Sequence, residues 1–350
     1  MTFGVSLPTN GQNRRRVLLQ LGAAMGAVLL AEKLLAQPQD KIKVAAVYSV
    51  PIGQPWVSRV HHALVLAQSR GEIEYVYSEN IAASHYEAKL RQYANKGVQL
   101  IVGEAFESDA HAYQVAKDYP DIAFLIGSTN RPQQPNLAVF NNYIHEPTYL
   151  TGMIAGGLSQ TGTIGLIASY AIPTVNCLLH AFMDGVREIN PDARFLVTFT
   201  HSYFDPPKAR QAAFSQIDQG ADVIYAEHVS AAQAAQQRGK LMIASMVDAQ
   251  PLYPDTIVAS AVWDMGPTIE RALTMVKRGK FKADDYGKYS QMRYQGAMLA
   301  PLGTFEDKVP SALIALVQAR QQTMLDGRFT IKLNDTPPQT SASLTQISGK

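Results

Sequence analysis

The sequence predicts an α/β protein built from two similar three-layer lobes, each with a parallel sheet. Apolar runs of strand length alternate with amphipathic helical segments along most of residues 41–327. One such run, GVQLIVGEAF at residues 97–106, has a near-copy in shape at residues 220–229, which read GADVIYAEHV. In both places a helix ends at a glycine and a buried strand then leads to a polar residue. The second half of the chain is therefore expected to repeat the architecture of the first.

In the first half, buried strands are predicted at residues 42–48, 73–77, 100–102 and 122–126, because these runs are rich in apolar and β-branched residues without strict alternation. Helices are expected at residues 56–69, 84–96 and 109–118, and Ser84 and Glu87 match a capping box at the start of the second. A short strand at residues 137–140 and a Gly- and Ala-rich helix at residues 146–159 follow. Strands buried on both faces indicate a parallel sheet covered by helices on both sides.

The second half repeats the scheme, with strands predicted at residues 163–168, 195–199, 223–226, 241–244 and 257–262. A late strand at residues 295–299 and a last helix at residues 311–325 suggest that the chain crosses between the lobes more than once, which makes a multi-strand hinge. We expect one lobe from residues 41–160 plus about 263–290. The other would hold residues 161–262 plus about 291–327, and residues 328–350 are expected to form a loosely ordered tail.

Residues 1–36 have the features of an export signal. Three arginines, Arg14 to Arg16, precede an apolar stretch at residues 17–31 that is shorter than the roughly 20 residues of a membrane span. The paired arginines favour the twin-arginine route. Cys177 is the only cysteine, so we expect no disulfide and no lipid anchor at the start of the mature chain. The expected location is the periplasm.

The sequence lacks the common motifs of catalysis. It has no phosphate loop, no G-x-G-x-x-G after the first strand, no G-x-S-x-G and no H-E-x-x-H. His61 and His62 are adjacent, so on a helix they point about 100° apart and cannot chelate one metal as a pair. The net charge of +2 comes from the arginines of the export signal, so a nucleic-acid partner is not expected either. We predict no catalytic residue, metal site or cofactor.

Polar and aromatic side chains follow the predicted strands, at the ends where open α/β sheets bind ligands. Aromatic faces stack on flat heterocycles, and carboxylates or amides bind N–H groups and sugar hydroxyls. Arg and Lys are missing from these loops, which argues against an anionic ligand. The candidate ligand-binding residues are Gln54, Trp56, Glu104, Phe106, Tyr203, Phe204, His228, Asp248 and Trp263.

The mature chain resembles the basic membrane protein family of substrate-binding proteins for ABC importers, which includes purine-nucleoside receptors. The resemblance covers nearly all of residues 41–327 and rests on SVPIGQPWVSRVHHAL, EPTYLTGMIAG and the more specific INPDA and IDQGADVI runs. It implies a fold like that of type I periplasmic binding proteins, whose two lobes close over a purine or its nucleoside.

The resemblance also implies roles for individual residues. Trp56 and Phe204 would lie on the base, and Asp248 would anchor polar groups of the ligand. Gln54 stands where relatives commonly carry an acid, which leaves the hydrogen-bond pattern with the ligand open. The remaining candidates that would line the pocket are Glu104, Phe106, Tyr203, His228 and Trp263.

The resulting hypothesis is a monomeric periplasmic receptor that binds a purine or nucleoside-like heterocycle and presents its closed form to the membrane permease of an ABC importer. Two alternatives remain open at this point. One is a hydrolase of nucleosides or glycosides that uses Glu104 and Asp248 as acid and base. The other is a periplasmic sensor that reports its ligand to a membrane kinase.

Overall fold

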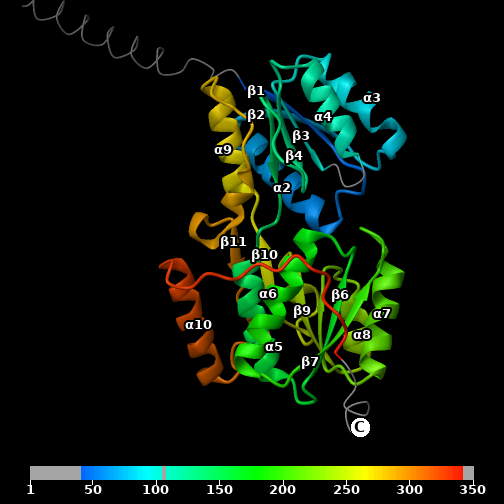
Figure 1. Ribbon diagram of the computed structural model, residues 1–350, viewed down its shortest axis with the longest axis vertical. Helices are drawn as coiled ribbons and strands as arrows, with labels where there is room; N and C mark the ends of the chain where they lie inside the picture. The colour runs from blue at the N-terminus through cyan, green and yellow to red at the C-terminus, as the bar shows by residue number, and fades with distance from the viewer. Residues whose placement is uncertain (1–40, 105–107, 342–350) are drawn as a thin grey trace, which may run out of the picture. The chain divides into compact units, whose positions relative to one another are not determined.

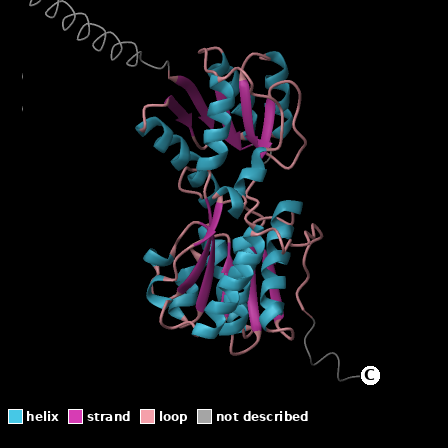
Figure 2. Cartoon of the chain, turned by 90° about the vertical axis from the view of Figure 1, so that its left-hand side faces the viewer, coloured by secondary structure: helices cyan, strands magenta, loops and turns pink. Residues whose placement is uncertain are grey.

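The computed structural model describes residues 41–104 and 108–341, and the described residues from Ile42 onward form one compact unit. The export signal expected at residues 1–36 and the candidate Phe106 lie outside the described residues. Two separate sheets are present, and helices lie on both sides of the strands in each (Figures 1 and 2). This is the α/β fold of two parallel-sheet lobes that the sequence predicts.

The first sheet has five parallel strands in the order β2-β1-β3-β4-β5. In chain order they are β1 (Ile42–Val47), β2 (Ile73–Ser78), β3 (Leu100–Glu104), β4 (Ala123–Gly127) and β5 (Leu137–Phe140). The helices between them are α2 (Pro55–Ser69), α3 (Ala83–Ala94) and α4 (Asp109–Asp118).

Both faces of the first sheet are buried, which explains why its central strands are apolar without alternation. In β1, Val44 and Ala46 belong to the core that includes α2. Ala45 and Val47 point the other way, into a second core with α3 and α4. Successive side chains of a strand point to opposite faces, so a strand covered on both sides must be apolar at every position.

The second sheet has six strands in the order β11-β10-β9-β8-β6-β7. They are β6 (Thr163–Ala168), β7 (Arg194–Phe199), β8 (Val223–Ala226), β9 (Leu241–Met246), β10 (Ile257–Trp263) and β11 (Ala297–Leu299). Only the β10–β11 pair among these strands is antiparallel. The associated helices are α5 (His145–Leu158), α6 (Pro173–Ile189), α7 (Pro206–Asp218), α8 (Ala231–Gln237) and α10 (Ser311–Leu325).

Helix α5 packs closely against α6, and glycines on both helices allow the close approach. A Cβ on Gly152 would lie 2.2 Å from the backbone oxygen of Phe182, and one on Gly185 would lie 2.0 Å from that of Tyr149. Figure 1 shows the two helices side by side. The sequence assigned α5 to the first lobe, whereas its packing partner belongs to the second.

The chain passes between the lobes after β5, after β10 and after the short 3-10 helix η2 (Tyr286–Ser290). Helix α9 (Gly266–Lys277), between the last two crossings, returns to the first lobe, where Glu270 lies 3.5 Å from Arg70. The other 3-10 turns are η1 (Gln250–Leu252), η3 (Met292–Tyr294) and η4 (Gly303–Phe305). Three crossings make the hinge between the lobes.

One buried chain of hydrogen bonds joins the three crossings. The indole N–H of Trp263 donates to the Ser290 hydroxyl at 2.8 Å, and that hydroxyl donates to the backbone carbonyl of Asn141 at 2.9 Å. Trp263 and Ser290 are fully buried and Asn141 nearly so. The crossings are therefore held to one another and must move in concert.

Two local expectations differ from the structure. Helix α3 begins before Ser84, which therefore does not cap it, and Glu87 instead accepts a hydrogen bond from Arg91 at 2.9 Å. The segment after α10 was expected to be loosely ordered from residue 328. As far as residue 341 it forms neither helix nor strand, yet the Ser341 N–H donates to the Phe195 carbonyl of edge strand β7 at 2.8 Å.

Within residues 41–104 and 108–341, no helix has both the length and the apolar character needed to cross a bilayer.

Candidate ligand-binding site

A cavity of about 120 Å³ lies where the carboxyl ends of strands from both sheets meet. Its wall takes residues that follow β1, β3, β4 and β5 in the first lobe and β6, β7 and β8 in the second, together with the last residue of β9. This is the position at which open parallel sheets bind ligands. The side chains of the wall that carry oxygen or nitrogen include Gln54, Trp56, Asp109, Ser128, Asn141, Asn142, Tyr203, Glu227 and His228.

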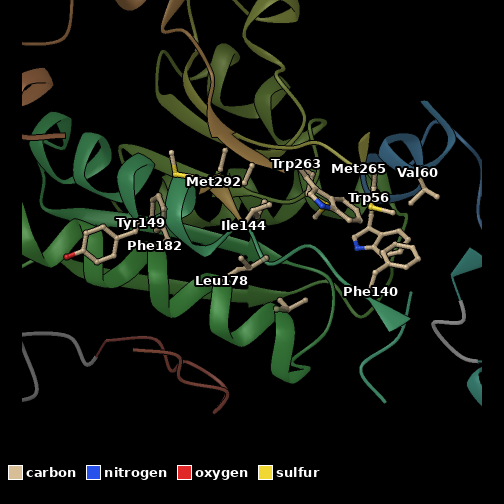
Figure 3. Packing of buried hydrophobic residues seen from close by; sticks show 14 of the residues in the cluster. Trp56, Val60, Phe140, Ile144, Tyr149, Leu178, Phe182, Trp263, Met265 and Met292 are labelled. Carbon is tan, nitrogen blue, oxygen red and sulfur yellow. The ribbon is translucent and has the colours of Figure 1, made fainter. Parts of the chain in front are cut away.

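Trp56 connects the cavity to the hydrophobic core. Gln54 caps α2 by accepting the Val57 N–H at 2.8 Å, which places Trp56 in the first turn of the helix. Its ring stacks on Phe140 with centroids 5.3 Å apart and lies tilted against Trp263 at 5.0 Å (Figure 3). Only 6% of Trp56 is exposed. The indole is thus held by the core on one side while it forms part of the cavity wall.

Gln54 also joins the two lobes across the cavity. Its side-chain N–H donates to the backbone carbonyl of Tyr203 at 3.3 Å. The Tyr203 ring lies against Tyr170 of the same lobe, with centroids 4.6 Å apart. Because Gln54 belongs to the first lobe and Tyr203 to the second, this hydrogen bond forms only when the lobes are close together.

Two carboxyl groups line the cavity. Burial raises the pKa of Asp109, and hydrogen bonds from Ser128 and Asn130 offset part of this shift. Burial also raises the pKa of Glu227. The Ser169 N–H donates a hydrogen bond to its Oε2 at 2.7 Å, which lowers that pKa and offsets part of the shift. Among the described residues of the wall there is no Lys or Arg. The cavity is therefore suited to a ligand that carries hydrogen-bond donors and no negative charge.

His228 faces the cavity from the loop after β8, and only 4% of it is exposed. Burial lowers the pKa of its imidazole, while hydrogen bonding to the backbone of Ser202 and the nearby Asp205 oppose the shift. The ring is therefore neutral at pH 7 and offers one donor and one acceptor.

A family model described as ABC transporter substrate-binding protein PnrA-like matches residues 41–289. The chain belongs to this family. Membership confirms the resemblance seen in the sequence, and it makes the chain a substrate-binding protein of an ABC transporter, which binds its ligand without catalysis. The hydrolase alternative is therefore wrong.

Relatives of this PnrA-like protein differ in the ligands for which they are named. A protein of Haloferax volcanii named as an ABC transporter glucose-binding protein is 32% identical over 255 residues, which cover 71% of this chain and 64% of that protein. A purine-binding protein of Brucella abortus is 32% identical over 244 residues, which cover 68% of this chain and 69% of the relative. This chain thus spans about two thirds of each.

A solved structure shares the fold. The crystal structure of an ABC transporter solute-binding protein from Aeropyrum pernix has a TM-score of 0.74 at 19% identity, over 84% of this chain and 94% of the other. The likeness confirms the two-lobed fold expected of a PnrA-like binding protein.

The structure brings four of the nine candidate residues to one cavity, namely Gln54, Trp56, Tyr203 and His228. The other described candidates do not line it. Asp248 is exposed and caps a turn by accepting the Gln250 N–H at 3.2 Å.

Glu104 and Phe204 also do not line the cavity. Glu104 is fully buried and accepts the backbone N–H of Ser49, so its carboxylate fixes the loop after β1. Phe204 is 40% exposed and lines a neighbouring surface depression with Asp248. Glu104 and Asp248 thus do not face one another, as an acid and base pair would.

Trp263 is a core residue of this PnrA-like protein instead of a pocket residue. It is fully buried, and its only polar atom donates to Ser290. The strand-end position is as expected, but β10 runs into the hinge, where Trp56 and Phe140 cover the indole.

Asp109, Asn141, Asn142 and Glu227 were not among the candidates selected from the sequence, although Glu227 directly precedes the candidate His228. Asn141 and Asn142 directly follow β5, so the strand-end rule would have found them had the short strand been given equal weight. Asp109 lies in the first turn of α4, several residues beyond the end of β3. A search restricted to the two or three residues after each strand misses it.

Proposed function

We propose that this PnrA-like protein is exported to the periplasm and binds a purine base or nucleoside-like heterocycle in the cavity between its lobes. The observation that carries the proposal is the composition of the wall, where the aromatic ring of Trp56 meets carboxyl and amide groups and the described wall residues include no Lys or Arg. Stacking on an aromatic ring is worth roughly 1–3 kcal/mol per base. Such a wall suits a flat, uncharged ring with N–H groups.

Delivery to a membrane permease follows from the family and from the hinge. A ligand held by residues of both lobes favours the closed arrangement, because only that arrangement offers all of its contacts. The hydrogen bond from Gln54 to the Tyr203 carbonyl adds a direct contact between the lobes in that state. The permease of an ABC importer would then receive the closed, loaded form.

A sugar is the second candidate ligand, because the relative from Haloferax volcanii is named for glucose. Hydroxyl groups are also donors, and the carboxyl and amide groups of the wall could bind them. A sugar has no flat aromatic face, however, so it would gain less from the ring of Trp56.

A thermal-unfolding panel tests the proposal. The purified protein is heated with adenine, guanine, hypoxanthine, adenosine, guanosine or D-glucose, each at several concentrations. A ligand at 100 times its Kd stabilises the folded state by about 2.7 kcal/mol, which raises the Tm of a protein of this size by several degrees. We expect a purine or its nucleoside to give this shift. A shift with glucose and with none of the purines would overturn the purine assignment and favour a sugar.

The variant Trp56→Leu checks the role of the ring. Because most of Trp56 is buried, the variant is expected to unfold at a lower temperature without ligand. The informative quantity is therefore the ligand-induced shift relative to the same variant alone. We expect this shift to be largely lost, and a shift as large as in the unaltered protein would contradict the stacking role.

A further inference from the structure

One ring nitrogen of His228 lacks a partner. Nε2 is buried and makes no hydrogen bond to any residue in the described part of the chain. Buried polar atoms in folded proteins are nearly always paired. An unpaired ring nitrogen on a residue that lines the cavity points to a hydrogen-bond partner that the chain itself does not supply.

The surroundings of His228 determine which nitrogen carries the proton. Against the larger effect of burial, the backbone of Ser202 raises the pKa of the imidazole and so favours a proton on the side of the ring that faces it. Since Nε2 has no partner, the donor is Nδ1. In a neutral imidazole the other nitrogen then has no hydrogen, so Nε2 carries a lone pair that no described residue of the chain occupies.

We propose that Nε2 of His228 accepts a hydrogen bond from an N–H or amino group of the ligand, and that this contact sets the specificity of the cavity. The inference rests on the proposed function, because it takes the ligand to be a heterocycle with such donors. It deepens that function by naming the residue that distinguishes a ring with a free donor from one whose donor is blocked.

The neighbouring groups favour the same chemistry. Asp109 and Glu227 line the same cavity, and their carboxylates are acceptors as well. A phosphate or carboxylate on the ligand would meet two acidic groups and no Lys or Arg among the described wall residues. The ligand class is therefore a neutral or cationic heterocycle rich in N–H donors, not a nucleotide. Sites that bind an N–H in this way discriminate strongly against analogues that lack it.

Two variants separate the two nitrogens of His228. In His228→Asn the side-chain amide can still donate to Ser202 from near the position of Nδ1, but nothing replaces Nε2. In His228→Gln the longer side chain places an amide near the position of Nε2, where its oxygen can accept. Both replacements are polar and smaller than or similar to histidine, so they serve as matched controls for each other.

The test combines these variants with ligand analogues in titration calorimetry. The probes are adenine and guanine, each compared with derivatives methylated at one nitrogen at a time. In the unaltered protein we expect one methyl derivative to bind at least about tenfold more weakly than its parent. In His228→Asn the parent should lose on the order of tenfold in affinity, the free-energy equivalent of one hydrogen bond. The difference between the parent and that derivative should then shrink to about twofold, while His228→Gln keeps part of it.

The outcomes distinguish this inference from the proposed function. Equal affinity of the unaltered protein and His228→Asn for the parent, or the same discrimination against the methyl derivative in both, would overturn the role of His228. Should His228→Asn fail to fold, the analogue series on His228→Gln decides, because a rotatable amide must change the pattern of discrimination if this position contacts the ligand. If no purine binds even to the unaltered protein, the proposed function fails and this inference with it.

Discussion

The ring of Trp56 packs directly against Gly127, where no side chain intervenes, and the substitution Gly127→Ala tests this close contact. The added Cβ would lie 2.2 Å from Cη2 and 2.9 Å from Cζ2 of Trp56. Carbon atoms that are not bonded prefer about 3.5–4.0 Å, so the ring would have to move by more than ~1 Å. Phe140 and Trp263 already contact the indole from the core, so it has little room to retreat. We expect overpacking to destabilise the fold by about 1–3 kcal/mol.

The same shift should weaken ligand binding, because the displaced indole either enters the cavity or turns its face away from the ligand. Urea unfolding gives the loss of stability, and calorimetry with the best purine of the panel gives the loss of affinity, expected to be about tenfold or more. Gly53→Ala is the matched control, since it adds the same methyl group near the start of α2 where no atom lies within 4 Å. Stability and affinity equal to those of Gly53→Ala would refute the reasoning.

Three further predictions concern the hinge, the contact between lobes and the buried carboxyl group. Gln54→Glu keeps an oxygen to cap α2 but removes the N–H that donates to Tyr203 and buries a carboxylate beside that carbonyl, so both ligand affinity and ligand-free stability should fall; an unchanged Kd would count against this contact. Ser290→Ala leaves the buried indole N–H of Trp263 unpaired and should cost about 1–3 kcal/mol in urea unfolding, and a cost near zero would mean that the hydrogen-bond chain is dispensable. Because burial raises the pKa of Glu227, the folded state holds its proton to higher pH than the unfolded chain, and stability is lost as pH rises through the folded pKa. Glu227→Gln should therefore gain stability relative to the unaltered protein as pH rises above about 4.3, the pKa of an unperturbed Glu, and parallel pH profiles in ligand-free urea titrations would contradict this.

The strands were the most predictable part of the fold. In β1 every residue from Val44 to Val47 is buried, so an uninterrupted apolar run was a sufficient signal. The Gly- and Ala-rich helix α5 was also predicted, although not its packing against α6. Which lobe a helix joins depends on contacts far apart in sequence, and no local pattern contains that information. The cap of α3 was also predicted wrongly. Ser84 and Glu87 fit a capping pattern, but the helix begins at Ala83 and has no side-chain cap.

The strand-end rule predicted part of the site. It correctly places residues at one edge of a sheet, and Gln54, Trp56, Tyr203 and His228 lie together there. It does not determine the direction in which each side chain points. Trp263 is at a strand end yet faces the hinge core.

Polar candidates were misjudged for a related reason. A carboxylate at a strand end can serve the ligand or the loops around it, and the sequence alone does not separate the two. Glu104 accepts a hydrogen bond from the Ser49 N–H, and Asp248 accepts one from the Gln250 N–H. Both carboxylates therefore pair with backbone N–H groups of nearby loops. Glu227 lines the cavity although it also accepts the Ser169 N–H. Only the three-dimensional arrangement of the loops distinguishes these uses.

The central claim, that the cavity between the lobes takes a purine-like ring, is tested most directly by a competition titration in a calorimeter. The protein is titrated with the purine that gave the largest thermal shift, first alone and then in the presence of increasing concentrations of D-glucose. We predict a 1:1 binding isotherm with the same Kd whether or not glucose is present. No heat from the purine would contradict the claim, and an apparent Kd that rises with the glucose concentration would show that glucose competes for the same cavity.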